Sequence, residues 1–186
     1  MAEPTIPDRV RWAVEQLKLQ SDHRVLEIGG GPGAAAELIC PRLDQGWLLD
    51  LDRSATAIER SRRRNQAHLD SGRLRLQHAE LRDLDLPAGS VDIAFSVNVN
   101  LFWTGSAGVE LGVLFQALAP AGRLLILFGP GPAGSDQQRV LARVQDAVAA
   151  SPFRSSSAWA ECRGAGVIAQ RPGPRATTVE GWPTTR

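Results

Sequence analysis

The sequence predicts an α/β fold in which a doubly wound, mostly parallel sheet of seven strands is flanked by helices. Short apolar runs alternate with amphipathic stretches along the chain, which is the pattern of strands connected by helices. Most of these runs are apolar without alternation, as in strands covered on both faces. With 186 residues, 43% of them hydrophobic, the chain can build one core but is short for two domains.

Each element is predicted from its local pattern. Helical periodicity or composition predicts helices over residues 6–19, 34–39, 54–69, 108–118 and 137–150. Apolar runs predict strands over residues 24–28, 47–51, 74–77, 91–97 and 123–128, and two closing strands over about 153–159 and 167–169. Ser54 is the candidate N-cap of the third helix, and Pro41 should end or bend the second.

Composition limits the classes of protein that fit. We expect one domain over residues 1–171 and a flexible tail, rich in Pro, Gly and Thr, over residues 172–186. A net charge of +1 lacks the basic excess of non-specific nucleic-acid binding. Apolar stretches fall short of the roughly 20 residues of a membrane helix, and residues 1–12 lack the apolar run of a signal peptide. A soluble, cytoplasmic protein is therefore expected.

The two cysteines predict no metal site. Cys40 and Cys162 match no metal-binding or redox spacing, and two buried free thiols are favoured over a disulfide between them.

A glycine-rich segment, EIGGGPG over residues 27–33, separates the first predicted strand from the next helix. Gly29, Gly31 and Gly33 let the backbone turn sharply and let a ligand lie against the main chain. In a doubly wound sheet, ligands bind beyond the carboxyl ends of the strands, where this loop would lie. A tight turn without a ligand is the alternative.

An aspartate at the end of the second strand strengthens the prediction of a binding site. Asp52 falls about 20 residues after the glycines, where a carboxylate can accept hydrogen bonds from both hydroxyls of a ribose. Asp50 is the rival, but alternation along a strand leaves it inside rather than at the mouth. Either aspartate could instead only cap the helix that begins near Ser54. A glycine loop and an acid so spaced also fit a nicotinamide or flavin dinucleotide.

Four segments separate these cofactor classes: residues 25–33 (VLEIGGGPG), 49–62 (LDLDRSATAIERSR), 78–103 (HAELRDLDLPAGSVDIAFSVNVNLFW) and 118–127 (LAPAGRLLIL). In this order they resemble the class I S-adenosylmethionine-dependent methyltransferases, over roughly residues 9–170. A dinucleotide-binding domain requires neither Glu27 before the glycines nor the Pro-Ala-Gly turn. The resemblance implies a Rossmann-like fold and methyl transfer from S-adenosyl-L-methionine.

The resemblance also implies roles for individual residues around the cofactor. The main chain at Gly29, Gly31 and Gly33 would contact its methionine part, and Glu27 would help to hold its ammonium group, directly or through water. Asp52 would bind the ribose diol.

Further roles concern the adenine and the methyl group. Arg53 would lie beside the adenine. Glu80 stands where the family usually has an aspartate that binds the adenine amino group, and Leu81 would donate its backbone N–H. Asn98 would face the sulfonium and its methyl. Glu80 could instead be an exposed loop acid, and Asn98 could serve only to tie down the end of a strand.

The acceptor is not identified by the sequence. Asn100, Phe102 and Trp103 are candidates for one wall of its pocket, although the two aromatic residues are equally expected in the core. No general base is predicted. Residues 98–101 lack the Asn/Asp-Pro-Pro-aromatic signature of methylases that act on nucleic-acid amino groups, and the arginine-rich residues 60–64 fit a solvated helix face.

The chain shows no sizeable insertion for a lid. We therefore expect a small-molecule acceptor in a pocket partly closed by the first helix or by a partner subunit, and a homo-oligomer is left open. A domain that binds the cofactor without catalysis, and an NAD(P)-dependent oxidoreductase, are the alternatives.

Overall fold

A computed structural model of the chain describes residues 5–129, 137–153 and 155–173. Its helices are α1 (Asp8–Gln16), α2 (Ala34–Ile39), α3 (Ala55–Arg64), α4 (Gln66–Asp70), α5 (Leu101–Thr104), α6 (Gly108–Ala117) and α7 (Gln137–Ala149), with 3-10 turns η1 (Cys40–Arg42) and η2 (Leu81–Asp83). Its strands are β1 (Arg24–Ile28), β2 (Trp47–Asp52), β3 (Leu74–His78), β4 (Val91–Val97), β5 (Leu118–Phe128), β6 (Ser155–Glu161) and β7 (Gly164–Gln170).

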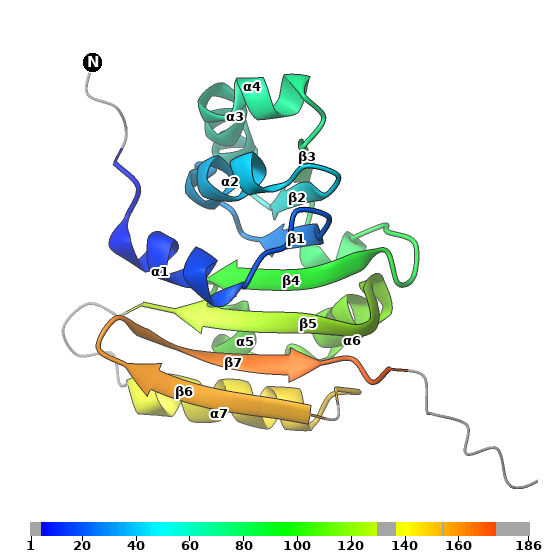
Figure 1. The fold of residues 1–186 in the computed structure, drawn as a ribbon. Helices are drawn as coiled ribbons and strands as arrows, with labels where there is room; N and C mark the ends of the chain where they lie inside the picture. Colours follow the sequence, from blue (N-terminus) through cyan, green and yellow to red (C-terminus); the bar gives the residue numbers. More distant parts are fainter. Residues whose placement is uncertain (1–4, 130–136, 154, 174–186) are drawn as a thin grey trace, which may run out of the picture.

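The strands form one seven-stranded sheet in the order β3-β2-β1-β4-β5-β7-β6 (Figure 1). The first five run parallel, and β7 lies antiparallel between β5 and β6. Because β1 pairs with both β2 and β4, the strand order reverses at β1. The doubly wound, mostly parallel sheet predicted from the sequence is confirmed. In such sheets a crevice opens where the order reverses, at the carboxyl ends of the strands.

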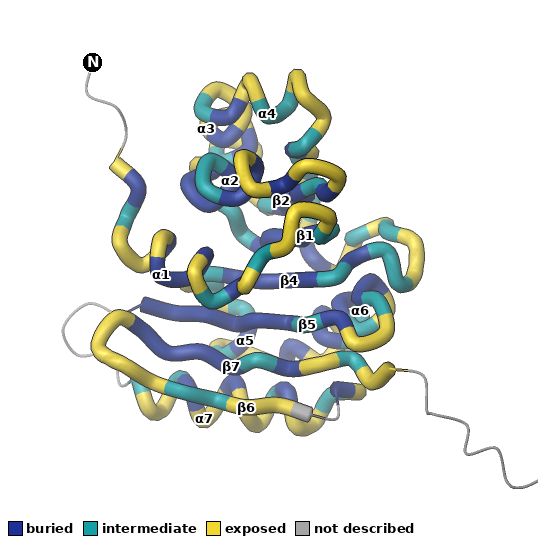
Figure 2. Tube along the Cα trace, in the orientation of Figure 1, coloured by how far each residue is buried: buried dark blue, intermediate teal, exposed yellow. Residues whose placement is uncertain are grey.

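Apolar side chains cover both faces of the sheet. The cluster under α1 and α2 includes Trp12, Ala13, Ile39, Leu48 and Phe95. The cluster under α5, α6 and α7 includes Phe102, Leu111, Leu114, Leu124 and Val144. The central strands β4 and β5 are buried along most of their length, whereas the edge strand β6 is largely exposed (Figure 2). Strands that are covered on both faces have nearly continuous apolar sequences, and this pattern made it possible to predict β4 and most of β5 from the sequence.

The ends of some elements differ from the prediction. The first helix is shorter than residues 6–19, because it begins after Pro7 and the chain turns at Lys18, whose φ is +49°. The helix predicted over residues 54–69 is broken at Asn65. Strand β5 begins at Leu118 rather than at residue 123, because Leu118 pairs with Val91. The short helix α5 was not predicted.

Other expectations concern the chain ends and the cysteines. The tail expected over residues 172–186 lies, from residue 174 on, outside the described residues. Both cysteines are free, but only Cys40 is buried. The prediction of two buried thiols was wrong for Cys162, because this residue lies in the turn between β6 and β7. Within the described residues, no helix is long and apolar enough to span a membrane.

Candidate active site

A cavity of about 480 Å³ lies at the carboxyl ends of β1, β2, β3 and β4. This volume is within the range of about 300–1,000 Å³ that is usual for small-molecule sites. Its walls are residues 28–29, 51–53, 79–81 and 98–101, with Thr104 of α5. Several residues predicted for the site therefore meet around one space: Gly29, Asp52, Arg53, Glu80, Leu81, Asn98 and Asn100.

The glycine loop crosses the end of β1. Gly29, Gly31 and Gly33 have φ angles of +70°, +58° and +75°, a region that L side chains rarely adopt. Gly29 lines the cavity, and its N–H donates to the Leu51 carbonyl at 2.7 Å. Gly31 and Gly33 are not part of the lining; Gly33 is the N-cap of α2. The loop is therefore fastened to the end of β2 and presents its first glycine to the cavity.

Asp52 stands at the mouth of the cavity, as expected. Its Oδ2 accepts a hydrogen bond from the Gly31 N–H at 2.9 Å, and its Oδ1 accepts one from the Ser54 N–H at 2.8 Å. A carboxylate offers about four acceptor positions, so each oxygen can accept a further bond from a ligand. The helix itself is capped by Ser54, whose hydroxyl accepts from the Ala57 N–H at 3.3 Å. Ser54 is confirmed as the N-cap.

Two further acids lie deeper, on paired positions of β1 and β2. Glu27 is 4% exposed and Asp50 is fully buried. Burial, and then the nearby Asp50 and Asp52, raise the pKa of Glu27 well above its usual value. Burial also raises the pKa of Asp50 to about 6, against the lowering effect of a hydrogen bond from Ser61. Glu27 Oε2 is buried without a hydrogen-bond partner among the described residues, so a cation reaching it would favour the carboxylate form.

The outer wall is formed by the ends of β2 and β3. Arg53 is exposed and lines the cavity, and its carbonyl oxygen lies 3.0 Å from Nε2 of His78. Glu80 is exposed beside it and directly precedes η2. Leu81 is the first residue of that turn, a position whose N–H has no partner within the helix. The predicted adenine-side residues are thus adjacent.

Asn98 joins the ends of β4 and β5. It adopts a φ of +58°, its N–H donates to the Leu127 carbonyl at 2.9 Å, and its Oδ1 accepts from the Gly129 N–H at 2.8 Å. Asn98 therefore does hold the strand ends together, as the alternative interpretation of this residue expected. It also lines the cavity.

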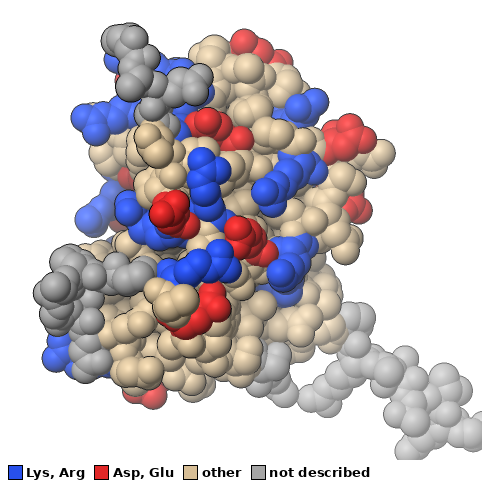
Figure 3. All heavy atoms as spheres, turned by 60° about the vertical axis from the view of Figure 1, so that its left-hand side comes forward, with Lys and Arg blue, Asp and Glu red and all other residues tan. Residues whose placement is uncertain are grey.

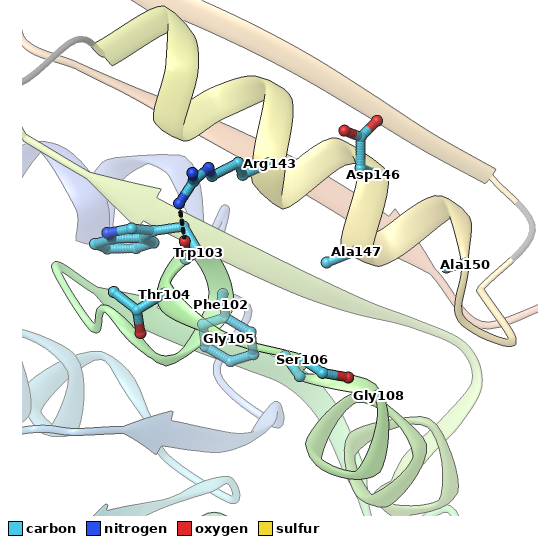
Figure 4. A pocket seen from close by; sticks show the side chains of 11 residues that line it. Phe102, Trp103, Thr104, Gly105, Ser106, Gly108, Arg143, Asp146, Ala147 and Ala150 are labelled. Atoms are coloured by element: carbon cyan, nitrogen blue, oxygen red, sulfur yellow. Dashed lines mark hydrogen bonds between the residues drawn. The ribbon is translucent and has the colours of Figure 1, made fainter.

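The three residues predicted to form one wall of the acceptor pocket do not line the same cavity. Asn100 lines the main cavity, whereas Phe102 is 1% exposed and belongs to the core. Trp103 packs at a tilt against Phe128, with ring centroids 5.7 Å apart. Phe102 and Trp103 both line a second hollow of about 400 Å³ between α5, the loop after it, and α7 (Figure 4). Thr104 belongs to both spaces, so the two adjoin.

Sequence reasoning missed several residues of this region. Thr104 and Val99 line the cavity, but no local pattern marks a four-residue helix such as α5. Ser61 and Asn65, which lie under the glycine loop, carried a signal that could have been read. Their spacing of three and seven residues from Ile58 puts them on the same helical face as this apolar residue, and that face is buried.

The residues present fit a ligand that combines a ribose with a cationic group. Gly29 exposes main chain, Asp52 retains acceptor capacity, and Glu27 Oε2 is a buried acceptor without a partner among the described residues. Together with the sheet order, these residues agree with the resemblance to the class I S-adenosylmethionine-dependent methyltransferases.

Comparison with known proteins agrees. The family described as methyltransferase domain matches residues 25–122, and the chain belongs to it. It is similar to the uncharacterized methyltransferase YdaC of Bacillus subtilis (strain 168), at 25% identity over 130 residues, 69% of this chain and 68% of that protein. It is also similar to trans-aconitate 2-methyltransferase of Paracidovorax citrulli, at 32% identity over 64% of this chain and 45% of that enzyme, so it spans less than half of this relative.

Among solved structures, a SAM-dependent methyltransferase from Aquifex aeolicus shares the fold, with a TM-score of 0.72 and 16% identity over 91% of this chain and 94% of that one. The enzyme class and its cofactor, S-adenosyl-L-methionine, follow from the family.

Proposed function

We propose that the chain transfers the methyl group of S-adenosylmethionine to a small-molecule acceptor. One observation carries the proposal: a cavity walled by the ends of four strands adjoins a second hollow through Thr104. One space suits the cofactor, and the other gives an acceptor room beside it.

The residues expected to hold the cofactor are those named from the sequence. Gly29 offers its main chain, Asp52 binds the ribose diol, and Glu27 attracts the ammonium group. Arg53, Glu80 and Leu81 form the adenine side. Positions in the cavity wall support these roles for all of them except Glu27, which does not line the cavity. The role of Glu27 is supported by its buried Oε2, which has no partner among the described residues, and binding measurements on variants test each role.

The cofactor supplies an already activated methyl group, so the protein needs chiefly to orient the acceptor and exclude water. Asn98 and Asn100 follow β4 and line the cofactor cavity, and Thr104 of α5, a few residues further on, is shared by the two spaces. Helix α1 reaches the same edge, because the Arg9 side chain packs against Gly129 at the end of β5. Partial closure by the first helix, expected from the sequence, is therefore part of the proposal.

The acceptor would occupy the hollow beside Trp103. Its lining combines the indole of Trp103 with small residues of the loop after α5 and with two charged residues of α7 (Figure 4). Arg143 donates to the Trp103 carbonyl at 3.1 Å and so holds the two helices together. Such a space suits a compact molecule with a flat apolar part.

A nucleic-acid acceptor is not expected. Basic and acidic side chains are interspersed on the face drawn in Figure 3. On α3, Arg62 and Arg63 lie 3.8 and 2.8 Å from Glu59, and Arg64 lies 2.5 Å from Glu37. The exposed Arg62 and Arg63 fit the solvated face predicted from the sequence, whereas the side chain of Arg64 is only 9% exposed. That the protein is cytoplasmic remains a prediction from the sequence, and so does the option that it forms a homo-oligomer.

The test begins with calorimetric titration of the purified chain with S-adenosylmethionine and with its demethylated product. A methyl-release assay then covers trans-aconitate and other small carboxylic acids, phenols, amines and thiols. We expect saturable binding of both cofactor forms and turnover with at least one acceptor. Tight binding without turnover on any acceptor would point instead to a non-catalytic binding domain.

A variant separates the two spaces. Trp103→Ala should raise KM for the acceptor and leave the cofactor Kd within about twofold, because Trp103 lines only the second hollow. A weaker cofactor Kd with an unchanged acceptor KM would contradict this assignment.

A further inference from the structure

Three buried polar side chains lie beneath the glycine loop, outside the cofactor cavity. Asp50 comes from β2, Ser61 from α3, and Asn65 from the break between α3 and α4. Asp50 and Ser61 are fully buried and Asn65 is 2% exposed. None of the three lines the cavity. Polar groups are costly to bury, so such a cluster needs an explanation from its contacts.

Hydrogen bonds connect the cluster to the loop. Asn65 Nδ2 donates to the carbonyl oxygen of Gly33 at 3.0 Å and to that of Ser61 at 3.1 Å. Ser61 Oγ donates to Asp50 Oδ2 at 2.8 Å. Chain segments from β2 and α3 thus reach the glycine loop through one continuous chain of polar contacts.

Close packing explains two of the glycines. A Cβ at Gly33 would collide with Asn65 Nδ2 and Ser61 Oγ, and a Cβ at Gly30 would collide with the Asp50 carboxylate. The loop backbone therefore rests directly on the three side chains. No ligand is needed to account for Gly30 and Gly33. Packing also constrains Gly29 at the cavity wall, where a Cβ would lie 2.6 Å from the Val99 side chain.

The helix break places the amide of Asn65. Its φ and ψ are −117° and 25°, outside the helical region. Its N–H still donates to the Ser61 carbonyl, while its own carbonyl accepts from the N–H groups of His68 and Leu69. Because Asn65 closes one helix and opens the next, its side chain is fixed from both sides.

We propose that Asp50, Ser61 and Asn65 are positioning residues that hold the glycine loop in the conformation that binds S-adenosylmethionine. The inference rests on the proposed function of the cavity. It differs from the roles assigned to Glu27, Gly29 and Asp52, because the three residues act on the cofactor only through the loop.

Asn65→Ala leaves the Gly33 carbonyl without its side-chain donor. We expect the Kd for S-adenosylmethionine to rise about tenfold, which corresponds to the loss of one buried hydrogen bond, with little change in the acceptor KM. Asp50→Asn keeps the shape and can still meet the rotatable hydroxyl of Ser61, so its Kd should stay within about threefold of the natural chain.

Ile58→Ala is the matched control, since Ile58 is buried on the same face of α3 but contributes none of the atoms nearest to a Cβ at Gly30 or Gly33. It should destabilise the fold without weakening cofactor binding. Equal losses of affinity in Asn65→Ala and Ile58→Ala at 25 °C would overturn the proposal, because a general loss of stability would then explain both.

A second measurement does not need the cofactor. Amide hydrogen exchange of the free protein should be faster at Gly30, Gly31 and Gly33 in Asn65→Ala than in Ile58→Ala. Unchanged exchange there would overturn the proposal, whatever the binding result. Failure of the natural chain to bind S-adenosylmethionine would refute the proposed function instead, and accelerated exchange in Asn65→Ala would still show that the cluster holds the loop.

Discussion

Asp52 is the residue whose loss should weaken cofactor binding most directly. Both of its oxygens already hold backbone N–H groups, and it lines the cavity. In Asp52→Ala the ribose hydroxyls would lose their acceptor, at a cost of about 1–3 kcal/mol, or about 5- to 150-fold in Kd. Calorimetry measures this loss. Asp44→Ala, an exposed aspartate on the loop before β2, is the control and should leave Kd unchanged. Unchanged affinity in Asp52→Ala would move the ribose contact to another residue of the cavity wall; Asp50 is not a candidate, because it is fully buried and does not line the cavity.

Asp50 should also make stability depend on pH. Its pKa in the folded protein is about 6, above the ordinary value of 3.8. Between about pH 4 and pH 6 the folded chain keeps a proton that the unfolded chain has released, so stability falls as the pH rises through this window. Two pKa units correspond to about 3 kcal/mol. Urea unfolding from pH 4 to pH 7 should show a flatter profile for Asp50→Asn. Parallel profiles for the two proteins would contradict this expectation.

Single residues differ in how far the sequence could predict them. Asp52 and Gly29 were predictable because the end of a parallel strand and the turn after it are local features. For Ser61 and Asn65 the helical spacing could indicate burial, but their contacts with Asp50 and the glycine loop could not be predicted, because these bonds join segments that become neighbours only when α3 packs on the sheet. Phe102 illustrates the same limit, since its sequence position adjoins the site while its side chain enters the core.

Among the elements, α3 depends on the N-cap residue that precedes it. Ser54 accepts the Ala57 N–H at the start of a helix that bears four exposed or partly buried arginines. Ser54→Ala should cost about 1 kcal/mol of stability, and Ser54→Asp should restore most of it, because aspartate is also a good N-cap. Chemical denaturation measures both differences. If Ser54→Asp were no more stable than Ser54→Ala, the cap would not be the cause.

The ends of the elements show where local patterns stop being sufficient. Residues 24–28, 34–39 and 91–97 were predicted with the bounds that the structure has. Strand β5 extends back to Leu118 because it pairs with β4, and no local pattern reports that pairing. The break at Asn65 likewise coincides with a tertiary bond, from its side-chain amide to the Gly33 carbonyl, that no local pattern reports. Periodicity predicts the presence of an element better than its ends.

At the scale of the whole molecule, Trp12 connects the first helix with the last two strands. This residue of α1 is 1% exposed, lies against Gly164 of β7, and donates from Nε1 to Glu161 of β6. A Cβ at Gly164 would lie 2.6 Å from the indole, so the glycine leaves room for the ring. Helix α1 therefore packs on the antiparallel hairpin that closes the sheet, and the first and last elements stabilise each other.

Replacing Trp12 should for this reason destabilise the domain as one unit. Trp12→Ala removes a buried aromatic side chain, which costs about 3–5 kcal/mol of the roughly 5–15 kcal/mol that stabilises a typical domain. At about 2–4 °C per kcal/mol for a chain of this size, Tm should fall by about 10 °C, in a single transition. Trp12→Phe keeps most of the apolar burial but loses the bond to Glu161, so its fall should be smaller. Calorimetric unfolding compares the three proteins. A separate early transition in Trp12→Ala, with the Tm of the main transition unchanged, would show that α1 detaches alone and that the sheet does not depend on it.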